Sequence, residues 1–147
     1  MLNTIQGPTV INLPVLRAGK VGLSTVYTLL GFPYNGPLEG KFDFHGTRFR
    51  PTTELGWIER PIPTYFEHGT GELGRSVIGQ AYVGEATEDG RLIDVIIDRA
   101  NAYHDMLAEL HEKGFLRGSA QAIASMYEVS GDGDLVSFHP AEFSLTV

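Results

Sequence analysis

The chain of 147 residues carries 11 Lys and Arg against 18 Asp and Glu, a formal net charge of −7, and it contains no cysteine. Its length fits one domain, and its 42% hydrophobic and 20% charged residues are typical of a globular protein. The lack of cysteine excludes disulfides, thiolate metal sites and a cysteine nucleophile. Scattered basic residues argue against nucleic acid as a partner, and the apolar runs are shorter than the roughly 20 residues that span a bilayer. We also expect no signal peptide.

Alternating apolar and polar residues between glycine-rich turns predict short β-strands along most of the chain. We expect strands at residues 10–16, 24–30, 38–44, 62–67, 76–86, 91–98, 122–129, 134–138 and 142–147. R-A-G-K-V-G is expected to connect the first two strands. T-E-D-G and S-G-D-G are typical hairpin turns, so each is expected to join the strands on either side of it.

One segment has strong helical character. Its apolar residues recur at helical spacing, at Ala100, Tyr103, Leu107 and Leu110. Asp98 is expected as the N-cap and Gly114 as the C-terminal stop, which predicts one main helix over about residues 98–113. Many short strands with one helix indicate a β-rich α+β fold, a compact β-barrel that carries a helix, in a single domain of residues 1–147.

The five histidines are candidates for proton transfer, because the ordinary pKa of histidine lies close to working pH. His104 and His111 lie two turns apart on the predicted helix, and we interpret them as solvated, since metal-binding pairs usually lie one turn apart. His45 lies in a turn without an obvious partner. His68 ends a strand-like run and opens a glycine-rich loop, which is typical of a histidine that faces a cleft. We expect neither a metal site nor a cofactor.

A candidate nucleophile lies between the predicted helix and the strand that follows it. Ser119 follows Gly118 there, and nearby backbone N–H groups could form an oxyanion hole, although an ordinary turn serine fits the same pattern. Ser125, inside the next predicted strand, is a weaker candidate. Glu142 begins the last predicted strand and could orient the imidazole, and His139 is the alternative third member.

Short motifs occur in a fixed order from about residue 38 to residue 147. They are F-D-F-H-G-T-R-F, Y-F-E-H-G with V-I-G-Q-A, E-D-G-R-L-I-D-V-I-I-D, K-G-F-L-R-G-S and the closing A-E-F-S-L-T-V. In this order they resemble the prohead serine proteases of tailed phages, which are related in fold to herpesvirus assemblins. In that family such segments hold a catalytic histidine, a nucleophilic serine and an acidic residue. Residues 1–37 lie outside the resemblance.

The resemblance makes Ser119 the nucleophile, His68 the general base and Glu142 the residue that orients the imidazole. It implies a serine endopeptidase that cleaves scaffold protein, the scaffolding segment of the major capsid protein, or itself during phage head maturation. Such a protein would act inside the viral procapsid, in the host cytoplasm, without a cofactor, nucleic acid or a membrane. Assemblins dimerise, which implies a homo-oligomer, and family members continue past S-L-T, which implies a longer precursor.

Two residues after Ser119 depart from the family pattern. Members usually have S-x-G or S-S-G-A at the nucleophile, and this chain has Ala120 and Gln121 after Ser119. If the second serine of the family were the nucleophile, Ala120 would replace it and the chain would be inactive. A catalytically inactive module of the same fold, acting in capsid assembly, is therefore the alternative. A small β-barrel that binds a ligand is a third hypothesis.

Overall fold

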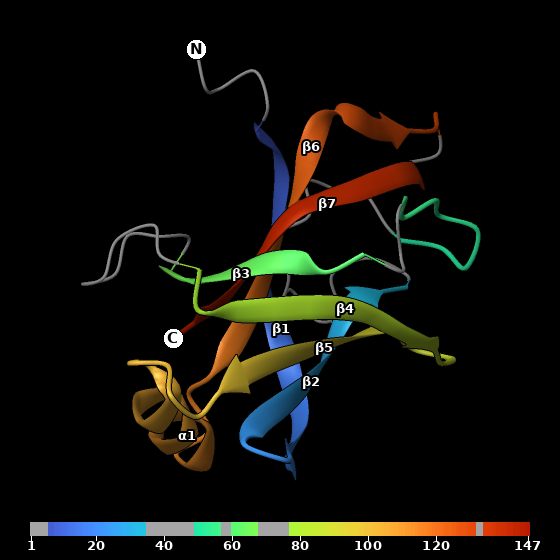
Figure 1. Cartoon of the computed structure of the whole chain (residues 1–147). Coiled ribbons are helices and arrows are strands. Elements are labelled where there is room, and N and C mark those ends of the chain that lie inside the picture. Colours follow the sequence, from blue (N-terminus) through green and yellow to red (C-terminus); the bar gives the residue numbers. More distant parts are fainter. Residues whose placement is uncertain (1–5, 35–48, 57–59, 68–76, 132–133) are drawn as a thin grey trace.

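The structure, a computed structural model, describes residues 6–34, 49–56, 60–67, 77–131 and 134–147. Within this part the strands are β1 (Gln6–Val21), β2 (Ser24–Pro33), β3 (Ile62–Phe66), β4 (Gly79–Ala86), β5 (Gly90–Asp98), β6 (Arg117–Val129) and β7 (Leu135–Thr146), and the helix is α1 (His104–Glu112). The strands form a closed barrel in the order β1-β2-β5-β4-β3-β7-β6 (Figure 1). The predicted β-rich barrel with one helix is confirmed, and the strand expected at 38–44 lies outside the described residues.

β1 and β2 form a longer hairpin than predicted. Residues 17–21, expected as a connection, pair with β2 in an unbroken register that ends at Val21↔Ser24. The turn consists of Gly22 and Leu23, and Gly22 has a φ of 60°. A glycine with positive φ at the first turn position is typical of a type II′ turn, whose twist matches that of the flanking strands. The strand pairing therefore continues to the tip of the hairpin.

The other two predicted hairpins are present. In the β4–β5 turn, the Oγ1 of Thr87 donates to the carbonyl of Gly90 at 2.8 Å and accepts from the Gly90 N–H at 3.2 Å. β6 and β7 pair on either side of Ser130. The strands predicted at 134–138 and 142–147 are one strand, β7. A bulge at Pro140 shifts the register, and the pairing with β6 continues on both sides of it.

α1 begins at His104, so the predicted start near Asp98 is wrong. The Oδ1 of Asp98 accepts from the N–H of Ala100, and the Oδ1 of Asn101 accepts from the N–H of Tyr103, both at 2.8 Å. Such bonds between side chain and nearby backbone hold the chain in turns and compete with helix formation. Ala100 and Tyr103, whose apolar spacing predicted a helix, therefore lie in turns before α1.

The end of α1 is as predicted. Gly114 has a φ of +75° and donates its N–H to the carbonyl of His111, while Phe115 donates its N–H to the carbonyl of Leu110. This pair of hydrogen bonds is a Schellman motif, which needs the left-handed conformation that glycine adopts without strain.

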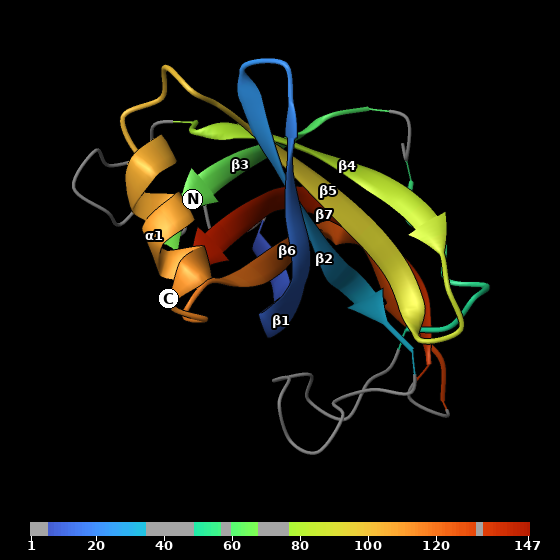
Figure 2. The ribbon, with the colours of Figure 1, turned by 90° about the horizontal axis from the view of Figure 1, so that it is seen from below.

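Alternate strand residues fill the barrel interior. On β5 the interior residues are Ile93, Val95 and Ile97, all fully buried and paired with Leu29, Tyr27 and Thr25 of β2. Towards the end of β2 the rings of Phe32, Phe49 and Phe138 pack edge to face with centroids 5.0–6.3 Å apart. α1 lies at the other end of the barrel, where β3 and β7 end (Figure 2).

Candidate functional site

Ser119 lies inside a strand, so its expected position at a junction before the strand is wrong. It is the third residue of β6 and pairs with Ser144 of β7. Just before β6, Leu116 is buried in the core, and the Arg117 guanidinium donates to the carbonyls of Gly114 and Leu116, both at 2.9 Å. The chain therefore passes directly from the end of α1 into β6.

The side chain of Ser119 points away from the barrel interior. A Cβ added to Gly118 would lie 2.5 Å from Leu29 Cδ2 and 2.7 Å from Phe143 Cζ, so Gly118 faces the core. Successive strand residues alternate between faces, which places Ser119 and its partner Ser144 on the outer face. Both are nevertheless buried, with 1% and 0% of their surface exposed. Two hydroxyl groups thus oppose each other in a buried polar site outside the apolar core.

Glu142 shares this outer face. It pairs with Gln121 in the next outward-facing row, and only 7% of its surface is exposed. Glu142 and Ser119 are diagonal neighbours on adjacent strands, and such residues lie about 7–8 Å apart. The structure therefore brings these two predicted residues together. Glu142 lies in the middle of β7 and not at the start of a strand, because β7 is continuous from Leu135.

Strand pairing is irregular on both sides of this pair. Between Val10↔Ala120 and Leu13↔Gly118, β1 has one residue more than β6, and the bulge lies opposite Ser119. A second bulge, between β6 and β7, lies directly after the pair Gln121↔Glu142. β-Bulges disrupt the backbone ladder and are over-represented next to active sites.

His68, the predicted general base, lies outside the described residues, as does His45. β3, the strand that leads to His68, runs parallel to β7, with Tyr65 paired with Ser144. Tyr65, Ser144 and Ser119 therefore form one row across three strands. After β3, Glu67 has a φ of 52°, and its Oε1 accepts the backbone N–H of Val147 at 2.9 Å. Glu67 is thus anchored to the residue that directly follows β7, the strand that carries Glu142.

His139, the alternative third member, lies away from Ser119. A Cβ added to Gly56 would be 2.7 Å from His139 Nδ1, so the imidazole packs against that glycine. Along β7, His139 is five residues before Ser144, roughly 16 Å at the usual strand rise. The structure favours Glu142 over His139 as the neighbour of Ser119.

The interpretation of His104 as a solvated residue is wrong. Only 5% of His104 is exposed; its Nε2 is 2.8 Å from Thr25 Oγ1, and its Nδ1 is 3.0 Å from Asp105 Oδ1. The hydrogen bond from His104, with smaller contributions from nearby positive charges, lowers the pKa of Asp105 below its ordinary value. The sequence signal was present, because His104 lies one turn before the buried Leu107 on the same helix face.

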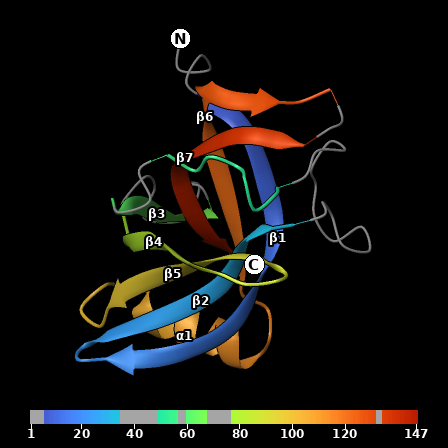
Figure 3. The same cartoon turned by 90° about the vertical axis from the view of Figure 1, so that its right-hand side faces the viewer.

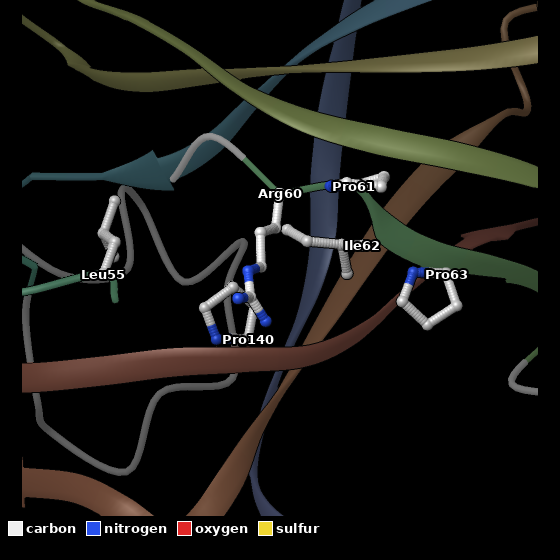
Figure 4. A pocket seen from close by; sticks show the side chains of 6 residues that line it. All are labelled: Leu55, Arg60, Pro61, Ile62, Pro63 and Pro140. Carbon is white, nitrogen blue, oxygen red and sulfur yellow. The ribbon is translucent and has the colours of Figure 1, made fainter. Parts of the chain in front are cut away.

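A small pocket lies along β3 and β7, away from Ser119. It encloses about 100 Å³ and is lined by Leu55, Arg60, Pro61, Ile62, Pro63 and Pro140. Arg60 extends across the pocket toward Pro140 (Figure 4). Pro140 pairs with Ala122 and not with the Ser119 row, so the pocket is separate from the serine pair.

Within the described residues, no group of three or more His, Cys, Asp or Glu side chains is arranged to hold a metal ion. In the same part of the chain, no helix has the length and apolar character needed to cross a membrane. No family model matches the chain, and no match was found among curated proteins or among solved structures.

Proposed function

We propose that the protein is a serine endopeptidase of the prohead-protease type that cleaves scaffold protein or the scaffolding segment of a major capsid protein. The observation that carries the proposal is the shared outer face of Ser119 and Glu142 on adjacent strands. Support also comes from β3, which leads to His68 and pairs with β7 at the Ser119 row. The three residues carry the motifs that resemble this family.

In the proposed reaction, Ser119 Oγ attacks a peptide carbonyl while His68 takes the hydroxyl proton. The tetrahedral intermediate collapses to an acyl-enzyme when His68 gives this proton to the leaving amine, and water then releases the acid by the reverse roles. Glu142 would hold the other ring N–H and stabilise the imidazolium. Backbone N–H groups released by the bulge beside Ser119 are the candidate oxyanion donors. Since Ser119 is 1% exposed, the proposal requires that substrate binding opens the site.

A second candidate function is a non-catalytic module of the same fold that acts in capsid assembly. It is favoured by the burial of Ser119 against Ser144 within a strand that is paired on both sides. Ala120 and Gln121, which depart from the family pattern, also support it. In that case the serine pair would be a structural feature of the β6–β7 ladder.

The test is to incubate the full chain with the major capsid protein and the scaffold protein of a tailed phage and to follow fragments by mass spectrometry. We expect cleavage by the wild type and by Ser144→Ala, and none by Ser119→Ala. The two substitutions remove buried hydroxyls from one residue pair, so their effects on folding are matched. Cleavage that survives Ser119→Ala would exclude this nucleophile. The absence of any cleavage by the wild type would favour the non-catalytic module.

A further inference from the structure

One edge of β1 has no partner strand near the hairpin tip, within the part of the chain that the structure describes. β1 pairs with β6 only as far as Pro14↔Arg117, whereas its pairing with β2 continues to Val21↔Ser24. Residues 16–21 of β1 are exposed. β1 borders this part of the barrel, and α1 lies behind the hairpin (Figure 3). Such an edge offers backbone groups to another strand.

The hairpin geometry shows which residues present these groups. In a hairpin with a two-residue loop, the residues that close the loop, here Val21 and Ser24, exchange both backbone hydrogen bonds. The pairs alternate along an antiparallel ladder, so Ala18 and Lys20 direct their backbone N–H and C=O groups to the free edge. An added strand would pair with these two residues.

The side chains of Ala18 and Lys20 lie on the face of β1 that is turned toward α1. With neighbouring residues of β1 and β2 they line a groove of about 170 Å³, whose second wall is Ala108 and His111. A Cβ added to Gly19 would meet no atom within 4 Å, so the middle of the free edge is open. Directly opposite residues of antiparallel strands share a face, so alternate side chains of an added strand would also face α1.

α1 follows the free edge in the direction from Lys20 to Ala18. The charge of Lys20 acts on the carboxylate of Asp105 at the start of the helix. Ala18 pairs with Tyr27, whose ring packs edge to face against the ring of His111 near the end of the helix, with centroids 5.6 Å apart. A residue added opposite Ala18 would therefore lie near the end of α1.

The two walls of the groove differ in charge. The first 38 residues of the chain contain no Asp or Glu, and β1 carries Arg17 and Lys20 near its tip. The exposed residues of α1 are all acidic: Asp105, Glu109 and Glu112. Lys113, directly after the helix, is already paired with Glu109, its Nζ 2.9 Å from Oε1. A strand that turns a basic residue toward α1 fits this wall, and β1 is itself such a strand.

Exposed apolar side chains lie at both ends of the free edge. Val21 and Leu23 are at the hairpin tip, and Leu16 is at the other end of the edge, each at least half exposed. Leu16 and the equally exposed Phe115 are each two residues beyond the last pair of the β1–β6 ladder. When two copies of one edge pair antiparallel, each tip meets the far end of its partner's edge, so these apolar ends would cover each other.

We propose that this edge is the interface of a symmetric homodimer, in which β1 of one protomer pairs antiparallel with β1 of its partner about Gly19. In this register Ala18 exchanges backbone hydrogen bonds with the partner's Lys20. Each Lys20 then lies near the end of its partner's α1, beside the partner's Glu112. β1 lies within residues 1–37, outside the family resemblance, so the inference does not rest on Ser119 or on peptide cleavage.

The neighbouring registers fit less well. Pairing centred on Lys20 places two like charges directly opposite each other, which is destabilising. Pairing centred on Ala18 brings the partner's hairpin tip opposite Pro14, which already pairs with β6. Pairing centred on Gly19 makes the two Lys20 residues diagonal neighbours, and the acidic residues of the two helices offset their charges.

The first experiment is sedimentation equilibrium of the full chain. We expect a reversible dimer with a Kd of about 10–100 µM, because the paired edge is short. Between dilute and concentrated protein, amide hydrogen exchange at Ala18 and Lys20 should slow by about threefold or more. Gly19 should not change, because it pairs with Val26 of β2 within the protomer. A chain that stays monomeric up to about 300 µM, or a dimer without slower exchange at these two amides, would overturn the proposal.

Matched variants separate this interface from other dimers. Ala18→Pro removes an N–H that the β1–β2 ladder does not use, so it should abolish the dimer and leave the monomer folded. Lys20→Glu and Glu112→Lys should each weaken the dimer by roughly fivefold or more, and the double variant should restore it. Glu88→Lys, at an exposed position of the β4–β5 turn, is the control for the change in charge. A dimer that survives Ala18→Pro, or a double variant no tighter than the single ones, would contradict this interface.

Discussion

Ser119 of β6 and Ser144 of β7 are paired in a buried row on the outer face of the barrel, and Tyr65 of β3 continues this row. The row brings together the strand of the candidate nucleophile, the strand of Glu142 and the strand that leads to His68. Peptide hydrolysis by a serine needs residues from such separate segments to meet. The pairing register, more than any single residue, supports the proposed site.

Glu142→Gln should lower kcat/KM by about 10²–10⁴, because the neutral amide does not stabilise the imidazolium that forms in the reaction. Stability should change little, since the two side chains are nearly the same size. The measurement is cleavage of the capsid or scaffold substrate, and Glu128→Gln, at an exposed position of β6, is the control. Full activity of Glu142→Gln would remove Glu142 from the proposed site.

Gly118→Ala should destabilise the protein by about 1–3 kcal/mol, the usual range for overpacking a core. The added methyl group would meet Leu29 and Phe143 in the interior. Gly19→Ala is the matched strand variant with open space at the Cβ, and it should be neutral or stabilising by about 0.5–1 kcal/mol. Urea unfolding measures both, and equal values would show that the core at Gly118 is loosely packed.

Thr25→Val should destabilise the protein by about 1–3 kcal/mol, because it leaves Nε2 of the buried His104 without its hydroxyl partner. Thr25→Ser retains the hydroxyl group and should lose less. The free energy of unfolding of the two variants gives the comparison. If Thr25→Ser were as unstable as Thr25→Val, the hydrogen bond between β2 and α1 would contribute nothing measurable.

Tyr27→Phe should change how stability depends on pH in alkaline solution. Burial raises the pKa of Tyr27 above its ordinary value of 10.0, so the neutral phenol is favoured in the folded protein. This contribution is fully present below pH 10.0 and is lost as pH rises through the folded pKa. The wild type should therefore lose stability relative to Tyr27→Phe as pH rises above 10.0. Parallel unfolding free energies across that range would contradict the burial of the ionisable hydroxyl.

Local sequence patterns predicted much of the fold. Alternating strands, hairpin turns and the Gly114 stop depend on neighbouring residues, and the structure contains all three. The start of α1 was missed because Asp98 and Asn101 bind nearby backbone groups. The hydrogen bond between His104 and Thr25 joins residues far apart in the sequence, so no local pattern reports it.

The candidate site was only partly predictable. Motif order selected Ser119 and Glu142, but their adjacency depends on the β6–β7 register, which a strand pattern does not specify. The same limit explains why Ser144, the direct partner of Ser119, was not singled out. The continuity of β7 was missed because Pro140 resembles a strand break, whereas the bulge accommodates it.

The most direct test of the proposed nucleophile is labelling of the full chain with a peptidyl fluorophosphonate, whose peptide part binds as a substrate does and opens the site, followed by peptide mapping to locate the modified residue. A reactive serine needs an accessible hydroxyl and a base that removes its proton. We predict an adduct on Ser119 that is lost in His68→Ala and retained in Ser144→Ala. An adduct on another serine, no adduct at all, or labelling of Ser119 that is unchanged in His68→Ala would contradict this prediction.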